Sequence, residues 1–200
     1  MVAEGYAKAL EDRSKRIEQL GEWCAAHLVP AEKRVLEIGC GHGHFLTAYA
    51  QANPTQTCVG IDLVTKRIEK GKSKAEKRGL EHLLFLKAEL SEFLEALPTG
   101  LQFDRVFMLF PDPWPKKRHH KNRMIQTAFL ERLDEITLPN ADFCFRTDHE
   151  GLFEWTVEHI NDSEHWAIDS EAAWPLEERS YFQDLMDSWQ SLVARKQGKA

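Results

Sequence analysis

Short apolar segments alternate with helix-like segments along most of this chain. Five of them carry the branched and aromatic side chains that favour strands, and two later segments are weaker candidates. The expected strands are residues 34–38, 57–61, 83–88, 103–110, 141–147, 165–169 and 188–196. Because strands that alternate with helices form parallel βαβ units, the pattern predicts an α/β fold with a mostly parallel central sheet of about seven strands and helices on both faces.

Helix-like segments fill the gaps between the strands. In the first of them, apolar residues recur at helical spacing among alanine and charged residues. The expected helices are residues 1–28, 45–52, 62–78, 91–97, 123–137 and 151–160, and Ser91 is the expected N-cap of the fourth. The segment 188–196 alternates polar and apolar side chains, which predicts a strand at the edge of the sheet.

Length and composition fit a single domain over residues 1–200, with an N-terminal helix (1–28) and an α/β core (33–200). The hydrophobic content of 42% supplies a large core. No apolar run approaches the roughly 18 residues that span a membrane, and residues 1–16 lack the apolar centre of a signal peptide. We therefore expect a cytoplasmic protein with no membrane segment, either a monomer or a homodimer.

Charge and cysteine content narrow the chemistry further. The net charge is −6 and the pI is near 5.9, which argues against non-specific nucleic-acid binding by the whole surface. A local basic site remains possible because electrostatic fields act at the scale of a patch. The cysteines are scattered without CxxC spacing, which predicts free thiols; they are Cys24, Cys40, Cys58 and Cys144.

A glycine-rich turn follows the first expected strand. Gly39, Gly41 and Gly43 lie between that strand and the next helix, at the sheet edge where open α/β folds bind ligands. Glycine permits a tight turn and a close approach of a ligand. Glu37 just before the turn can meet a cationic ligand, and Asp62 at the end of the second strand can accept hydrogen bonds from ribose hydroxyls. The GxGxG spacing differs from the dinucleotide pattern, and no Gly-Lys-Ser/Thr follows as in a P-loop.

The sequence ExGxGxG, followed by an acidic residue at the second strand, resembles the S-adenosylmethionine (SAM) site of class I methyltransferases. The resemblance implies a Rossmann-like class I methyltransferase fold with SAM as cofactor. The implied cofactor-binding residues are Glu37, Gly39, Gly41, Gly43 and Asp62, with Glu89 after the third strand as a candidate for the base edge of adenosine. A plain strand-to-helix turn and a nicotinamide site are the alternatives, and Glu89 is equally typical of a solvated residue that opens a helix. The spacing of Cys40, His42 and His44 follows from the glycine turn and requires no metal.

The stretch FPDPWPKKRHHKNR follows the fourth expected strand and therefore begins at the same sheet edge. Pro111 and Pro113 restrict the backbone on both sides of Asp112, which suits a carboxylate that orients a substrate. Trp114 can stack on a base or pack under the loop. The side chains beyond it can contact phosphates; they are Lys116, Lys117, Arg118, His119, His120, Lys121 and Arg123. A solvated loop is the alternative for this basic run.

This stretch, together with RMIQTAFLERLDEITLPNADFCFRTDHEGLFEW, resembles the bacterial single-chain tRNA (guanine-N7)-methyltransferase family. The similarity runs from about residue 35 to residue 160, with a weaker match near the C-terminus. It implies transfer of a methyl group from SAM to N7 of a guanine in tRNA, in the variable loop. It implies that Asp112 is the active-site carboxylate and that Lys116, Arg118, Asp148 and Glu177 contact the substrate, without a metal.

Three features depart from the family pattern. Trp174 stands where a late Thr-x-x-Glu motif has its Thr, Lys87 stands in the acidic-Ala pair after the third strand, and the chain lacks the extended N-terminal region of many members. The alternatives are therefore a SAM-dependent methyltransferase for another RNA or a small molecule, and a non-catalytic RNA-binding relative.

Overall fold

The computed structural model describes residues 2–29, 31–177 and 188–198. The strands are β1 (Arg34–Ile38), β2 (Thr57–Asp62), β3 (Leu83–Lys87), β4 (Phe103–Leu109), β5 (Thr137–Thr147), β6 (Trp166–Ile168) and β7 (Gln190–Lys196). The helices are α1 (Val2–His27), α2 (His44–Ala52), α3 (Thr65–Lys77), α4 (Leu90–Ala96), α5 (Thr127–Glu135) and α6 (Glu150–Asn161), and η1 (Lys117–Asn122) is a 3₁₀ helix.

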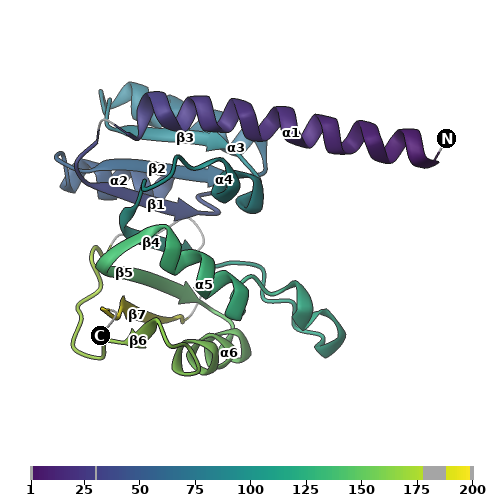
Figure 1. Cartoon of the computed structure of the whole chain (residues 1–200). Coiled ribbons are helices and arrows are strands. Elements are labelled where there is room, and N and C mark those ends of the chain that lie inside the picture. Colours follow the sequence, from purple (N-terminus) through teal and green to yellow (C-terminus); the bar gives the residue numbers. More distant parts are fainter. Residues whose placement is uncertain (1, 30, 178–187, 199–200) are drawn as a thin grey trace.

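The strands form one sheet in the order β3-β2-β1-β4-β5-β7-β6 (Figure 1). Strands β1 to β5 are parallel, whereas β7 pairs antiparallel with both β5 and β6. The chain adds β2 and β3 on one side of β1 and then returns to place β4 on the other side. The carboxyl ends of β1 and β4 therefore meet at the topological switch point, where open α/β sheets bind ligands. The predicted mostly parallel sheet is confirmed.

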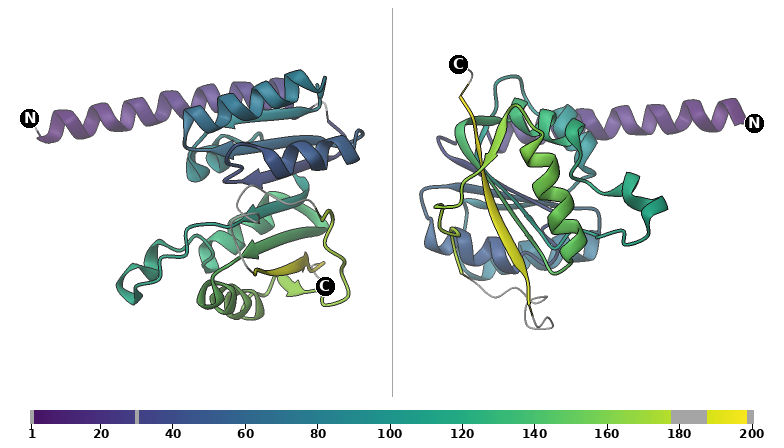
Figure 2. Two further views of the ribbon diagram at one scale, coloured as in Figure 1. Left: turned by 180° about the vertical axis from the view of Figure 1, so that it is seen from behind. Right: turned by 90° about the horizontal axis from the view of Figure 1, so that it is seen from below.

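Two apolar layers cover the sheet, one on each face. One layer joins α1, α4, α5 and α6 to side chains such as Leu36, Met108 and Phe143. The other joins α2 and α3 to side chains such as Val35 and Phe107. Figure 2 shows α2 and α3 side by side on the face opposite α1. All four cysteines are free and buried in these layers, as their scattered positions predicted.

Helix α1 is anchored through its middle and its carboxyl end, and Arg13 in the middle pairs with Glu95 of α4 at 2.5 Å. Leu20, Cys24 and Leu28 at its carboxyl end are buried against the core, and Arg16 forms an ion pair with Glu92 of α4 at 2.6 Å. The first half extends beyond the sheet (Figure 1). The helix that the periodicity predicted is therefore confirmed, although it contributes to the core over less than its full length.

Two strand predictions were wrong in position. Strand β7 is an inner strand, and the short β6 forms the sheet edge. The centre of β7 is buried at three successive residues, Leu192 to Ala194, which is typical of a strand covered on both faces. Strand β5 starts at Thr137, whereas residue 141 was the expected start. The strand continues through residues 137–140 because its pairing with β4 shifts register there and Asn140 adopts a positive φ of 63°.

Three helix starts also differ from the predictions: α3 begins at Thr65 rather than at residue 62, because Asp62 is still part of β2. Helix α4 is capped by Glu89, whose carboxylate accepts a hydrogen bond from the backbone N–H of Glu92, and Ser91 instead donates to that same carboxylate. Helix α5 begins at Thr127 rather than at Arg123, whose backbone is extended. The apolar periodicity of the helix continues backward through Ile125, which made the predicted helix too long.

Candidate active site

A cavity of about 380 Å³ opens at the carboxyl ends of β1, β2 and β4. Its walls come from the glycine turn, the segment after β2, the start of α4 and the loop after β4. Its lining includes Gly39, Asp62, Leu63, Glu89, Asp112, Trp114 and Met124. The cavity therefore brings together four of the residues predicted to bind the cofactor or to act in catalysis: Gly39, Asp62, Glu89 and Asp112.

The glycines of the turn have different surroundings. Gly39 and Gly43 both have positive φ, 72° and 67°, a region that side chains other than glycine rarely adopt. A Cβ on Gly43 would lie 2.3 Å from the Phe85 ring, whereas a Cβ on Gly39 would meet no atom within 4 Å. Gly43 is therefore required by packing, and Gly39 keeps a wall of the cavity open.

Asp62 holds the glycine turn in place. Its carboxylate accepts hydrogen bonds from the backbone N–H groups of Gly41 at 3.1 Å and Val64 at 2.8 Å. Arg67 of α3 lies 3.5 Å from the same carboxylate. Asp62 is buried but still lines the cavity. Because each carboxylate oxygen can accept more than one hydrogen bond, these contacts leave acceptor capacity for a ligand.

Glu37 is a buried carboxyl group in the middle of the sheet. It lies on β1 between Gly60 of β2 and Phe107 of β4 and is 3% exposed. Burial, together with the charge of Asp62, raises the pKa of Glu37 to about 8, against the effect of a hydrogen bond from the backbone N–H of Leu46. Its Oε2 has no hydrogen-bond partner among the described residues. A nearby cation would ionise this group and use the free oxygen.

Glu89 has a structural role as well as a place in the cavity wall. It is the N-cap of α4. Burial acts to raise the pKa of Glu89, but the hydrogen bonds from Ser91 and from the backbone of Glu92 prevail and lower it. The carboxylate is therefore ionised and fixed in direction, so both expectations for this residue, a helix-opening acid and a polar group near the ligand, agree with its position.

The loop that carries Asp112 is strained on both sides. Phe110 and Trp114 have positive φ values of 51° and 44°, which cost free energy in residues with side chains and are common at functional sites. The backbone N–H of Phe110 donates to the carbonyl of Arg146 at 2.8 Å, which ties the loop to β5. Asp112 itself is exposed in the cavity wall. No other residue in the described ranges donates a hydrogen bond to its carboxylate.

Arg123 anchors this loop from behind. Although the sequence placed it among the residues that contact phosphates, it is 3% exposed. Its guanidinium donates to the carbonyl of Pro113 at 3.0 Å and to the carbonyl of Gly151 in α6 at 2.9 Å, and it lies 5.1 Å from the centre of the Trp155 ring. That prediction was wrong for Arg123, because its hydrogen bonds are used to join the Asp112 loop to α6.

The remaining basic residues form an arm that projects from the body of the protein. The arm includes η1 and carries Lys116, Lys117, Arg118 and Lys121, all exposed (Figures 1 and 2). The two histidines turn back toward tryptophans: His119 contacts Trp114, and His120 contacts Trp155. The arm begins at the cavity wall, since Trp114 and Asn122 at its two ends both line the cavity.

Asp148 and Glu177 lie near the end of β5 and do not line this cavity. Asp148 is exposed directly after β5, whose neighbour β4 leads to the Asp112 loop. Glu177 pairs at 3.2 Å with Arg146, a fully buried arginine that also donates to the Ser191 hydroxyl at 2.7 Å. The sequence reading missed Arg146.

Trp174 covers the same arginine. The Arg146 guanidinium carbon lies 4.0 Å from the centre of the Trp174 ring, a cation–π contact. Burial lowers the pKa of Arg146. The tryptophan that replaces the expected threonine is therefore part of a packed unit with Arg146 and Glu177. An arginine at a strand position whose neighbours are apolar was the available signal for this unit.

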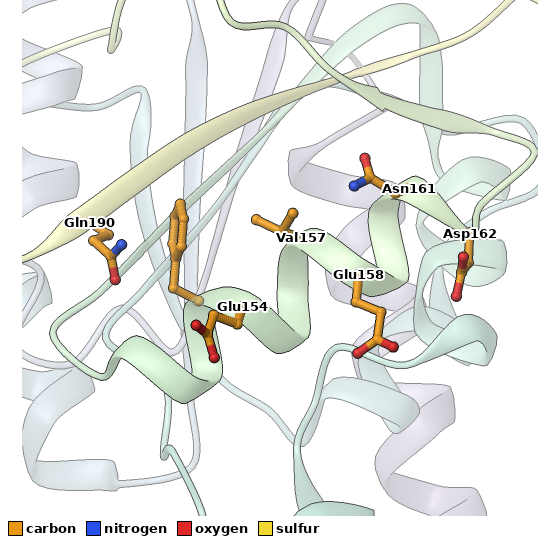
Figure 3. A pocket seen from close by; sticks show the side chains of 7 residues that line it. Glu154, Val157, Glu158, Asn161, Asp162 and Gln190 are labelled. Carbon is orange, nitrogen blue, oxygen red and sulfur yellow. The ribbon is translucent and has the colours of Figure 1, made fainter.

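A larger cavity, of about 580 Å³, lies on the outer side of α6 next to β7 (Figure 3). It is lined by Phe153, Val157, Asn161 and Gln190 together with three acidic residues, Glu154, Glu158 and Asp162. None of the residues singled out from the sequence lines it. Three carboxylates without a cation would repel a polyanion, so we assign the active site to the smaller cavity at the switch point.

Two features of other classes of protein are absent from the part of the chain that the structure describes. Within residues 2–29, 31–177 and 188–198, no three His, Cys, Asp or Glu side chains are grouped so that they could hold a metal ion. In the same ranges, no helix has the length and apolar character needed to cross a membrane.

Comparison with known proteins places the chain in a family. Residues 31–198 match the family described as "Putative methyltransferase". A tRNA (guanine-N(7)-)-methyltransferase from Rhodospirillum rubrum is 34% identical over 66% of this chain and 51% of its own length. One from Rhizobium johnstonii is 30% identical over 73% of this chain and 63% of its own length. The chain thus spans about half to two thirds of these curated relatives.

A solved structure supports the architecture. It is that of a 16S rRNA (adenine(1408)-N(1))-methyltransferase from Catenulisporales acidiphilia with cosubstrate SAM, with a TM-score of 0.60, 16% identity, and coverage of 89% of this chain and 92% of the other. This likeness confirms the predicted class I methyltransferase fold. Because the family model matches most of the chain, the protein belongs to the methyltransferase family that its glycine turn and its Pro-Asp-Pro-Trp stretch indicated.

Proposed function

We propose that this protein transfers a methyl group from SAM to N7 of a guanine in tRNA, in the variable loop, and that residues 1–200 act as one domain. The observation that carries the proposal is the position of Asp112. Its carboxylate is exposed, held by a strained loop, and lies in the same cavity as the glycine turn. The names of the two relatives support the choice of reaction.

Residues of the cavity wall and of the neighbouring turn and strand fit SAM chemically; Glu37, Gly41 and Gly43 adjoin the wall without lining the cavity. Glu37 offers a buried acceptor without a partner, which suits the cationic amino or sulfonium group. Gly39 leaves open space in the wall, and Gly41 and Gly43 complete the turn. Asp62 has acceptor capacity for the ribose hydroxyls, and Glu89 and the exposed Leu63, which also line the cavity, would contact the adenine. When bound, SAM would supply an electrophilic methyl group.

The chemistry at guanine requires alignment rather than a base. N7 has a lone pair and no hydrogen, so no proton has to leave before the methyl group is transferred. The protein must hold N7 in line with the methyl carbon and sulfur, with the reacting atoms roughly 3–3.5 Å apart. Asp112 can do this by accepting hydrogen bonds from the guanine N1–H and the exocyclic amine. Adenine lacks that pair of donors, so the same contact selects guanine.

The arm supplies the contacts to the RNA backbone. We propose that Lys116 and Arg118, with Lys117 and Lys121, bind phosphates and so supply affinity, whereas Asp112 supplies base choice. Asp148, exposed at the end of β5, would contact the substrate beside the Asp112 loop. Glu177, whose exposed carboxylate is paired with Arg146, would contact the substrate as well.

Label transfer tests the proposal. The protein is incubated with unmodified, folded tRNA and SAM that carries a labelled methyl group, and label in the RNA is counted. Incorporation with tRNA, and none with small-molecule acceptors, is the expected result. Calorimetry with SAM separates the non-catalytic alternative, for which no binding is expected. A protein that binds SAM and methylates another RNA but not tRNA would overturn the proposed substrate.

A further inference from the structure

A second polar cavity lies on the other side of the glycine turn from the candidate active site. Its volume is about 450 Å³, and it lies between the turn and α3. Its lining is His42, His44, Lys70, Ser73, Lys74 and Lys77. The lining contains three ammonium groups, two imidazoles and a hydroxyl, and no carboxylate. Such a set of donors suits a phosphate-bearing ligand.

The lysines of this groove belong to one stripe of α3. Lys66, Lys70, Lys74 and Lys77 recur every three or four residues, so they lie on one side of the helix. The opposite side is buried through Ile68, Gly71 and Ala75. Glu69 and Glu76 border the stripe without lining the groove. From Lys66 to Lys77 the stripe is about 16 Å long at 1.5 Å per residue.

Lys74 joins the stripe to the glycine turn. Its ammonium group donates to the carbonyl of His42 at 2.6 Å. Burial lowers the pKa of Lys74, and the neighbouring Arg78 and Lys70 add to this effect. The pKa of His42 is lowered by burial and then by Lys70, Lys74 and Arg67. The contributions of Lys70, Arg78 and Arg67 to these shifts reflect the cationic side chains gathered around the groove.

The buried carboxylate beside the glycine turn, that of Asp62, already has partners. It pairs with Arg67 at the start of α3 and accepts hydrogen bonds from the backbone N–H groups of Gly41 and Val64. In addition, α2 begins at His44 beside the groove, and its N-cap, Gly43, provides no side-chain cap; its first turn contains no acidic residue. The positive end of that helix therefore adds to the field of the lysines.

We propose that this groove, formed by His42, His44 and the Lys70–Lys77 face of α3, binds phosphates of the RNA backbone. The inference rests on the proposed function and extends it to a second contact with the same tRNA. The arm after β4 would grip the backbone on one side of the active-site cavity, and the groove would grip it on the β2 side. A stripe about 16 Å long exceeds a single phosphate and matches a run of backbone phosphates.

Charge reversal on α3 tests the inference with a matched control. Lys70→Glu and Lys77→Glu change the groove, whereas Lys72→Glu makes the same change on an exposed residue of the same helix that does not line it. Binding of tRNA is measured by filter retention at several salt concentrations. We expect each groove variant to weaken binding severalfold and to reduce the log–log salt slope by about one. Lys72→Glu should stay within about twofold of the parent.

Two controls accompany the binding measurement, one for folding and one for the severity of the substitution. Urea denaturation should give the same midpoint for all three variants, and Lys70→Ala and Lys77→Ala repeat the test with a milder change. If the groove variants and Lys72→Glu bind tRNA with equal affinity, the proposal that the groove binds phosphates is overturned. The methylation proposal would remain intact. A different outcome is that the groove variants bind tRNA more weakly but the parent protein makes no methylated tRNA. That result would support the groove as a binding site and overturn the proposed function.

Discussion

The substitution Glu37→Gln should raise the stability of this protein at high pH and at the same time weaken its binding of a cation. The folded state holds Glu37 buried, with a pKa raised from 4.5 to about 8. In that state the carboxyl group binds its proton more tightly than in the unfolded chain. Its contribution to stability is therefore greatest below pH 4.5 and is lost as the pH rises from 4.5 through about 8. Glutamine keeps the shape and cannot ionise.

The size of the effect follows from the two pKa values. One unit of pKa difference corresponds to about 1.4 kcal/mol. A pKa raised from 4.5 to about 8 therefore lowers the free energy of unfolding of the wild-type protein by about 5 kcal/mol once the pH is well above 8. Glu37→Gln should therefore match the wild type near pH 5 and exceed its free energy of unfolding by several kcal/mol near pH 9. Urea denaturation across this pH range measures the difference.

A second carboxyl group provides a control of opposite sign. Glu92 pairs with Arg16 at 2.6 Å, and the hydrogen bond from that arginine lowers the pKa of Glu92. Glu92→Gln should therefore destabilise the protein at neutral pH and match it in acid. A stability difference for Glu37→Gln that stays constant from pH 5 to pH 9 would refute the reasoning about burial.

Cofactor binding gives the functional half of the same prediction. A cation prefers the ionised carboxylate, so the wild-type affinity for SAM should rise with pH up to about 8 through this group. Glu37→Gln should bind SAM more weakly and should lack that rise. Calorimetry at pH 6, 7 and 8 measures both. Equal affinity of the two proteins at pH 8 would remove Glu37 from the cofactor site.

Four further substitutions test the site. Gly43→Ala should cost several kcal/mol in urea denaturation, because a Cβ would lie 2.3 Å from Phe85, whereas Gly39→Ala should cost about 1 kcal/mol and mainly weaken SAM binding measured by calorimetry. Arg123→Met should lower kcat more than it raises the Kd for SAM, since it frees two carbonyls that fix the Asp112 loop; unchanged turnover would make the anchor dispensable. Asp112→Ala should abolish turnover and spare SAM affinity, and surviving turnover would end its orienting role.

The sequence was most informative where local preference and tertiary structure agree. The segment RVLEI forms β1 over the predicted residues, because its branched side chains suit a strand covered on both faces. Gly39, Asp62 and Asp112 meet in one cavity because parallel strands bring their carboxyl ends to one edge. Such placements follow from chain order alone.

The errors arise where only tertiary contacts decide. Nothing local separates Arg123 from the other cations of its run, yet it is buried against α6 while Lys116 is exposed. In the sequence, Trp174 is a departure from the expected Thr-x-x-Glu motif. Its contact with Arg146 depends on the folded structure and has no local sequence signal. Glu89 rather than Ser91 caps α4, because the helix already includes Leu90 and Ser91, and the Glu89 carboxylate accepts the hydrogen bond from the N–H of Glu92.

The chemical identity of the product tests the central claim most directly. The wild-type protein is incubated with SAM and an unmodified tRNA transcript, and the RNA is digested and analysed by mass spectrometry with the modified position mapped. We predict 7-methylguanosine at one guanine of the variable loop. Methylation of another base or another atom, or no methylated nucleoside with a folded tRNA, would contradict the account.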